Sequence, residues 1–458
     1  MGMAAESGLP AAPRKTLSLF DACALIVGIM LGAGIFRAPA IVATQVQSET
    51  VFMLLWLAGG LISIAGALCY AELASRFPHA GGEYHFLRLA YGEQLAFLFA
   101  WSRMSVVQTG AIAALAFVFA DYASRLAPLG THGTTLYAGL IVVAITVLNA
   151  SGTSHGKWFQ NVLTAALAGA IVVIVAAGLM ADVPRALAPN PMAQEPTAAF
   201  TGLAVIFVML TYGGWNEAAY LGGELKELRR NIVRALVIGI VAVTAIYLAM
   251  NFAYLRVLGL EGLRGARAPA ADLVQAVFGA ADAAVVSLLV IVASAATLNA
   301  TVFTGARTNY AFGCDQPLFA FLGRWHGGAN APLRGLLWQG AIALVMVLLA
   351  ATTPDGFETL VAYTAPAFWL FFLLIGMALF VLRRRVTNDG AHFRVPLFPL
   401  PPLVFCAACG YMLVSCIDYA LTIETAGSLG ARLGLGVLAL GIPLMIVSRR
   451  MAAAAAAA

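Results

Sequence analysis

The chain has 458 residues, of which 62% are hydrophobic and only 10% are charged. A soluble domain carries about a quarter charged residues, so this composition excludes a cytosolic enzyme, a nucleic-acid-binding protein and a disordered chain. The net charge of +5 is spread along the chain instead of gathering in one patch. The surroundings of this protein are therefore predicted to be mostly lipid.

Apolar runs follow one another along the sequence, and a helix needs roughly 20 such residues to cross a bilayer. The predicted spans lie near residues 18–43, 51–75, 93–122, 134–150, 158–181, 200–223, 232–256, 282–313, 333–351, 357–382, 399–421 and 429–448. The alternation over about ten residues that a membrane barrel needs is absent from the sequence. We therefore predict an all-α integral membrane protein with about twelve transmembrane helices.

Lysine and arginine residues predict the orientation of these helices. With the N-terminus inside, 18 of the 26 Lys and Arg residues fall on the cytoplasmic side and six on the outer side. Cytoplasmic loops of membrane proteins have an excess of positive charge. We predict a multi-pass protein of the inner (plasma) membrane with both chain ends in the cytoplasm.

Two predicted spans contain glycine clusters in their middle. The first span holds Gly32-Ala33-Gly34, and the sixth holds Tyr212-Gly213-Gly214-Trp215-Asn216-Glu217. Close helix packing through small residues is one interpretation. We favour a second, in which both helices are broken, because glycine weakens a helix interior by roughly 1 kcal/mol per residue and the clusters are five spans apart. Interrupted helices at corresponding positions of two halves indicate a transporter site near the bilayer midplane.

This spacing predicts one transporter domain over residues 18–450, after an N-terminal segment at 1–17. The expected inverted repeat has its first half at about 18–181 and its second at about 200–382, with two added helices at about 399–448. The tail at 451–458 is rich in alanine and typical of an artificial extension. We predict nothing from it.

The two breaks would expose backbone groups of opposite polarity. In the first span, the N–H groups of Ala33, Gly34 and Ile35 would lie at the positive end of a helix dipole, which suits a carboxylate. In the sixth span, carbonyl groups between Leu210 and Gly213 could accept hydrogen bonds from an ammonium group. These two groups together predict a site for a zwitterionic α-amino acid.

Several motifs occur in a characteristic order, namely Gly32–Phe36, Tyr70–Leu73, Phe77-Pro78, Gly81–Tyr84 and Tyr212–Asn216. They resemble the G-[SA]-G-I-F, Y-x-E-L…P-x-x-G-G-x-Y and sixth-helix signatures of the amino acid–polyamine–organocation superfamily. Over nearly the whole chain, the sequence is similar to L-type and bacterial neutral amino acid exchangers. The resemblance implies a 5+5 inverted repeat with broken helices 1 and 6.

The resemblance also implies roles for individual residues. The N–H groups of Ala33 and Gly34 would hold the substrate carboxylate, and the carbonyls of Met30, Leu210 and Gly213 would hold its amino group. Leu210 matches the position of the outer gate, where relatives often have a bulky aromatic residue.

Asn216 matches a position that faces the substrate and links the site to neighbouring helices. Trp215 and Glu217 flank it and are candidates for gating or coupling. On an α-helix the side chains of Asn216 and Glu217 would diverge by about 100°, so we expect only one of them, Asn216, to face the cavity. Glu217 is kept as a proton-sensitive alternative.

The coupling ion is left open. Several relatives have a lysine in the fifth helix in place of sodium, and that position falls at about Leu167 here, with no lysine between Lys157 and Lys226. Hydroxyl groups of Ser294 and Thr297 in the eighth span could help to bind sodium. The alternative, which we favour, is that these hydroxyls bond to their own helix backbone.

Charged residues within spans are costly, so we expect them to be paired. Glu72 and Glu224 lie near cytoplasmic ends and are expected to pair with Arg76, Arg229 or Arg230. Arg103 is expected either to be paired or to extend toward the membrane interface.

The remaining signals exclude other classes. The segment Gly152–Lys157 is one residue short of a phosphate-binding loop, and neither H-E-x-x-H nor G-x-S-x-G occurs. We predict no enzyme activity, no cofactor and no metal centre. The Ala123–Gly133 loop has no cysteine, whereas animal relatives join a glycoprotein subunit through one there, so we expect no disulfide-linked subunit.

A neutral amino acid is the expected substrate. A symporter of a cationic amino acid or small amine is the alternative, and a channel or membrane enzyme is a remote one.

Overall fold

The computed structural model describes residues 18–79, 81–151, 156–181, 201–217, 225–326, 331–385, 392–422 and 426–457. Within these ranges the regular elements are helices, apart from isolated bridge residues at Leu225 and at the antiparallel pair His326 and Ala331. Nine of the described helices are long and apolar enough to cross a membrane. Three shorter apolar helices, Leu19–Met30, Leu167–Met180 and Gly202–Thr211, lie where the first, fifth and sixth spans are predicted. The predicted all-α membrane fold is confirmed.

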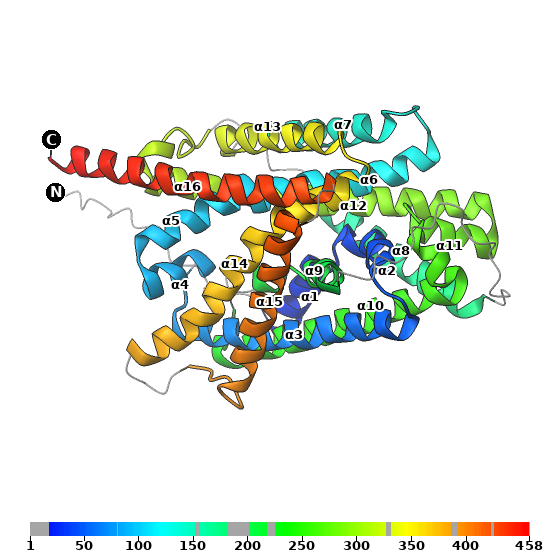
Figure 1. Ribbon diagram of the computed structural model, residues 1–458, viewed down its shortest axis with the longest axis horizontal. Helices are drawn as coiled ribbons and strands as arrows, with labels where there is room; N and C mark the ends of the chain where they lie inside the picture. The colour runs from blue at the N-terminus through cyan, green and yellow to red at the C-terminus, as the bar shows by residue number, and fades with distance from the viewer. Residues whose placement is uncertain are drawn as a thin grey trace, which may run out of the picture.

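The long helices are α3 (Glu49–Arg76), α6 (Gln108–Leu126), α7 (Gly133–Ala150), α8 (Gly156–Met180), α10 (Leu228–Arg264), α12 (Ala280–Asp315), α13 (Leu333–Ala350), α14 (Gly356–Arg385), α15 (Leu400–Thr422) and α16 (Ala426–Ala457). In Figure 1, α3, α10, α13 and α16 run along the longest axis of the molecule, whereas α14 and α15 cross it steeply. The shorter elements are α1 (Leu19–Met30), η1 (Ala33–Phe36), α2 (Ala38–Thr44), α4 (Gly82–Tyr91), α5 (Glu93–Ser102), η2 (Arg103–Val107), α9 (Thr201–Thr211), α11 (Pro269–Phe278) and η4 (Pro317–Phe319). In Figure 1, α1 and α9 lie near the centre, α4 lies at one end of the molecule and α11 lies at the other.

The first span is broken at the predicted position. Its first half, α1, begins with a capping box in which Ser18 and Asp21 exchange hydrogen bonds of 2.9 and 3.2 Å. After Met30 the backbone leaves the helical region, and Gly32 is extended, with φ −83° and ψ 168°. The chain then resumes as the short η1 and, after Arg37, as α2.

The sixth span is also interrupted at its glycine cluster. Helix α9 ends at Thr211, and Gly214 has a φ of +107°, in the left-handed region that favours glycine. A single turn of 3-10 helix then covers residues 215–217. Both predicted breaks are therefore present in the described residues.

The ends of the chain give less information. The predicted N-terminal segment at 1–17 lies outside the described residues. At the other end, α16 continues through the alanine-rich tail to Ala457. The repeat boundaries and the single-domain organisation stay predictions.

Candidate functional site

The two breaks face each other across a gap. A Cβ atom built on Gly34 would lie 3.7 Å from the side chain of Thr211, and α2 packs against α9. Gly34, Thr211, Gly213 and Gly214 are half-buried, whereas their neighbour Tyr212 is buried. The gap, the narrow space between the two breaks, is thus bordered by small side chains and backbone.

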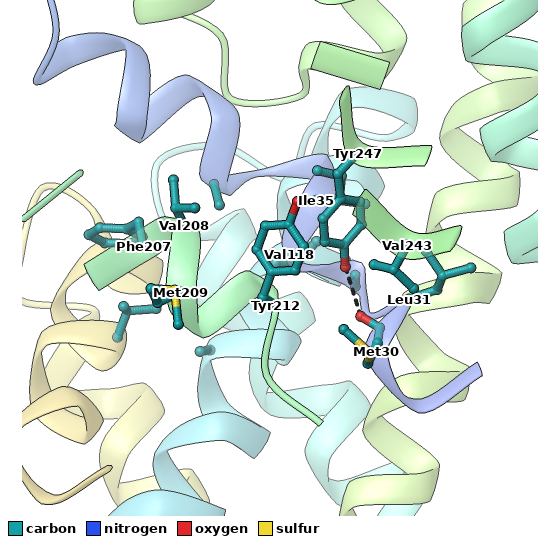
Figure 2. Close-up of a cluster of buried hydrophobic side chains, with 14 of the residues drawn as sticks. Met30, Leu31, Ile35, Val118, Phe207, Val208, Met209, Tyr212, Val243 and Tyr247 are labelled. Atoms are coloured by element: carbon teal, nitrogen blue, oxygen red, sulfur yellow. Dashed lines mark hydrogen bonds between the residues drawn. The ribbon is translucent and has the colours of Figure 1, made fainter. Parts of the chain in front are cut away.

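Tyr247 of α10 holds the two breaks together (Figure 2). Its hydroxyl lies 2.7 Å from the carbonyl oxygen of Met30 and 3.1 Å from that of Thr211. Met30 is the last residue of α1, and Thr211 is the last residue of α9. One buried hydroxyl therefore bridges the ends of both interrupted helices.

The first break offers backbone donors. The first N–H groups of a helix have no acceptor within that helix, which applies to Ala33 and Gly34 at the start of η1. The side chains of Ala33 and Ile35 are fully buried in the core, and Figure 2 shows Ile35 among these packed residues. A ligand at this position would meet the peptide backbone at Gly34 instead of side chains.

The two breaks together offer fewer carbonyl acceptors than we predict. The Met30 carbonyl already accepts hydrogen bonds from Tyr247 and from the Gly32 N–H group at 2.7 Å, which occupies both of its lone pairs. The Leu210 carbonyl accepts one bond, from Gly213 at 3.0 Å. Among the described residues, none donates to the Gly213 carbonyl. Counting donors from the described residues, the acceptors left over are the Gly213 carbonyl and the second lone pair of the Leu210 carbonyl.

A cavity of about 130 Å³ extends from the sixth-span break toward α4. Phe368, Phe371 and Phe372 of α14 form an aromatic wall, and Asn216 and Glu217 lie on the polar side. Our expectation that only one of these two neighbours faces the cavity is wrong. The turn at 215–217 is too short and too tight for the α-helical spacing to apply, and the cavity wraps around it.

The end of the cavity nearest α4 is closed by charged side chains. Arg103 donates hydrogen bonds to Glu83 at 3.2 Å and to Glu217 at 2.8 Å. The Asn216 amide nitrogen donates to Glu83 at 3.1 Å, while its oxygen accepts from the Gly214 N–H group at 3.2 Å. We call Glu83, Arg103 and Glu217 the inner cluster. It ties the sixth-span break to α4 and to η2.

Burial also changes the acidity of Glu83. Glu83 lies on α4, outside the membrane-crossing helices, and its side chain is 2% exposed. This burial raises the pKa of the Glu83 carboxyl above its ordinary value, although Arg103 acts in the opposite direction. Glu83 thus binds a proton more readily than a solvent-exposed glutamate does.

A second cluster lies on the opposite side of the gap, near α11. Arg37 follows η1, donates to the Ala266 carbonyl at 3.0 Å and pairs with Asp355 and, at 3.3 Å, with Asp121. We call Arg37, Asp121 and Asp355 the outer cluster. Our motif reasoning did not find it, although a basic residue inside a predicted span is itself a signal.

The other predicted residues lie outside the cavity. Trp215 is buried among aromatic rings, with its centroid 5.0 Å from that of Tyr70 and 5.6 Å from that of Phe372. Leu167 is buried in the core on α8. Their gating and coupling roles stay predictions, and any such role would act through packing.

The hydroxyl groups of the eighth span differ from each other. Thr297 donates to the Ala293 carbonyl of its own helix at 3.2 Å, as we favoured. Its methyl group would lie 3.8 Å from a Cβ atom on Gly32, so it borders the first break. The buried Ser294 hydroxyl has no hydrogen-bond partner among the described residues. A sodium site there stays a prediction.

The expected partners of Glu72 are wrong, whereas Glu224 lies outside the described residues. Its carboxylate receives two hydrogen bonds from Arg383 of α14, one of them 2.6 Å long, and a third from the Val395 N–H group at 2.7 Å. The nearest basic residues in sequence suggested a local pair. The actual pair joins two helices that are more than 300 residues apart.

The sequence is similar to known proteins over most of its length. The family model described as "Amino acid permease" matches residues 17–428. The serine/threonine exchanger SteT of Bacillus subtilis is 28% identical over 409 residues, which cover 88% of this chain and 91% of that protein. The mouse b(0,+)-type amino acid transporter 1 is 30% identical over 84% of this chain and 79% of its own length. The human large neutral amino acids transporter small subunit 2 is 28% identical over 88% of this chain and 76% of its own length.

Proposed function

Because the chain belongs to the amino acid permease family, we propose that it is a secondary transporter, a permease or exchanger, that moves neutral L-amino acids across a membrane. Proteins of this family are transporters and not enzymes. The observation that supports the proposal best is the approach of the two breaks, in which Gly34 faces Thr211 with no large side chain between them.

Each part of an amino acid would meet a matching group. The carboxylate would accept hydrogen bonds from the N–H groups of Ala33 and Gly34, and the ammonium group would donate to the carbonyls of Gly213 and Leu210. Met30 would contribute only if Tyr247 released its carbonyl. The substrate side chain would enter the cavity beside the aromatic wall, where burial of an apolar group contributes about 25 cal/mol per Å².

Alternating access has two candidate gates in this fold. The inner and outer clusters flank the gap, each with one arginine between two carboxylates. Helices five spans apart also pack against each other, as α3 with α10, α6 with α12 and α7 with α13. When two halves of a chain are related by a two-fold axis, equivalent helices of the two halves meet near that axis. These helix pairs therefore support the proposed inverted repeat.

The distribution of Lys and Arg supports cytoplasmic chain ends, and we propose the plasma membrane as the location. The lack of cysteine in the Ala123–Gly133 loop supports a chain without a disulfide-linked subunit.

One observation favours a second substrate class. The Glu217 carboxylate lines the cavity, so a cationic side chain is the alternative to a neutral one.

Substitutions at Gly34 test the proposed site. A Cβ atom there would make only an ordinary contact with Thr211, so Gly34→Ala should retain transport with reduced affinity. Gly34→Leu should abolish uptake in proteoliposomes, because its side chain would fill the gap. Gly139→Leu on α7 is the matched control, since a Cβ atom at Gly139 meets nothing within 4 Å. Wild-type uptake by the Gly34→Leu variant would contradict the proposal.

A further inference from the structure

An open groove runs along the outside of the molecule between α3 and α10. The two helices lie side by side along the lower edge of Figure 1, and both are long and apolar enough to cross a membrane. The groove has a volume of about 810 Å³. Most of its lining is apolar and comes from one face of each helix: Met53, Leu54 and Leu57 of α3, and Leu248, Phe252 and Leu255 of α10.

The two helices that form the groove run antiparallel. Trp56 lies against Tyr247, with ring centroids 5.8 Å apart, and a Cβ atom on Gly60 would collide with the Thr244 side chain. The residue numbers thus rise along α3 as they fall along α10. The beginning of the α3 face therefore lies beside the end of the α10 face.

The polar residues of the groove all lie at this one end. They are Glu49 and Thr50 at the start of α3 and Arg256 of α10, and the predicted topology places them at the outer membrane interface. Arg256 is exposed and donates one hydrogen bond, to the Ala181 carbonyl at 3.3 Å. No carboxylate of the described residues pairs with it. A guanidinium group has five N–H donors, so donors remain for an anionic ligand.

The groove is about as long as one leaflet of a bilayer is thick. From Glu49 to Leu57, and from Leu248 to Arg256, each helix rises by about 12 Å. The hydrocarbon core of a bilayer is about 30 Å thick, which gives roughly 15 Å for each leaflet. A chain that lies in the groove would therefore run from the interface through most of one leaflet.

The apolar side chains of the groove are uncovered in the described part of the chain. Leu54 and Phe252 are 56% and 48% exposed. Single exposed apolar residues are ordinary, but a concave apolar surface with a few polar groups at one end is typical of a ligand site. The ligand that matches this surface is long and apolar, with an anionic group at one end.

A second copy of the chain is a poor match for the groove. Two-fold dimers pair the same surface of each copy, so groove would face groove and the concave space would stay empty. A free phosphate ion would satisfy Arg256 but would leave the apolar lining uncovered. A phospholipid has both the acyl chain and the phosphate that the two parts of the groove require.

We propose that this groove binds one phospholipid, with an acyl chain between α3 and α10 and its phosphate on Arg256. Basic residues at the membrane ends of helices commonly bind lipid headgroups. Glu49 also interacts elsewhere, but a carboxylate accepts several hydrogen bonds. It and the Thr50 hydroxyl would accept from an amine or hydroxyl of the headgroup. The site goes beyond the proposed function and holds whichever solute the protein transports.

The bound lipid would support the helices that hold the two breaks in place. Trp56 and Tyr247 are fully buried behind the groove, and the Trp56 carbonyl accepts a hydrogen bond from the Tyr212 hydroxyl at 2.9 Å. Leu57 and Leu248 follow Trp56 and Tyr247 directly in the sequence and line the groove. The acyl chain would therefore press on α3 and α10 at the level of this aromatic contact.

Photo-crosslinking of the full chain in detergent tests the position of the lipid. The probe is phosphatidylethanolamine with a diazirine on one acyl chain, and the labelled residues are mapped by peptide mass spectrometry. Labelling should concentrate at residues 49–57 and 248–256 and should be competed by unlabelled phosphatidylethanolamine. Equal labelling of α7, whose Leu140 is 55% exposed, would show non-specific surface lipid only and overturn the inference.

A variant that fills the groove tests its shape. Leu54→Trp should reduce labelling of the groove by about tenfold, because the larger side chain occupies the space of the acyl chain. Leu61→Trp is the matched control, since Leu61 is 60% exposed on the same helix and does not line the groove. Equal labelling of the two variants would contradict a site in the groove.

A second variant tests the phosphate contact. Arg256→Gln should weaken the competing affinity of phosphatidylethanolamine by about tenfold, because a charge-assisted hydrogen bond is lost. Arg267→Gln is the control, since Arg267 is also an exposed arginine that donates to a carbonyl, that of Pro354 at 3.2 Å. Unchanged affinity in Arg256→Gln, or equal competition by diacylglycerol without a phosphate, overturns the phosphate assignment.

The remaining outcomes separate the possible occupants and the two proposals. Competition by inorganic phosphate alone, equal to that of the phospholipid, would make the site an anion site and overturn the lipid. A wild-type dimer in native mass spectrometry that carries no lipid and that Leu54→Trp dissociates would assign the groove to a second copy. A failure of amino acid uptake overturns the proposed function and leaves the labelling result unaffected.

Discussion

At the scale of single residues, Tyr247 links the two interrupted helices. Its hydroxyl is within hydrogen-bond distance of the last carbonyl of α1 and of the last carbonyl of α9. Figure 2 shows the ring of Tyr247 beside that of Tyr212, with ring centroids 5.1 Å apart. The glycine clusters indicate where the helices break, but the sequence does not show which residue spans the break, because Tyr247 lies in another predicted span.

Removal of this hydroxyl should have a measurable cost. We expect Tyr247→Phe to lower the free energy of unfolding by roughly 1–2 kcal/mol, because the hydroxyl that the Met30 and Thr211 carbonyls share as a donor is lost. Thermal unfolding in detergent measures the effect. Tyr254→Phe is the matched control on the same helix, since the buried Tyr254 hydroxyl has no partner among the described residues. Equal losses in the two variants would argue against the bridge.

At the scale of elements, the Glu72 carboxylate joins α3 to α14. Removal of one partner of a buried ion pair leaves an uncompensated charge, which costs roughly 3–5 kcal/mol. We expect Glu72→Ala to destabilise the protein by this amount in thermal unfolding, and Glu93→Ala, in an exposed pair with Arg88, to have little effect. Similar melting temperatures for the two variants would show that the α3–α14 pair contributes little.

The elements also show how far the sequence is informative. The breaks at Gly32 and Gly214 follow from local glycine content, and the structure places them where the sequence predicts. The partners of Glu72 and Arg37 cannot be predicted from the sequence, because they depend on which distant helices pack together. The relation between Asn216 and Glu217 was missed for another reason. Their turn is not α-helical, so a helical angle does not describe it.

At the scale of the whole molecule, the scarcity of charge acquires a specific meaning. Lipid explains why only 10% of the residues are charged. Arg37 and Arg103 both fall inside predicted spans, and each lies between two carboxylates. The two clusters that they form lie on opposite sides of the central gap. The proposed substrate site between them uses backbone groups, which present partial charges without the desolvation cost of an ionised side chain.

The most direct test of this account is uptake of a panel of labelled L-amino acids by proteoliposomes that contain the wild-type chain. Empty and amino-acid-loaded vesicles are compared with protein-free liposomes. The account predicts saturable uptake of neutral L-amino acids, which unlabelled substrate outside the vesicles reduces by competition. If no amino acid in the panel, neutral or cationic, enters the vesicles faster than it enters protein-free liposomes, the account is contradicted.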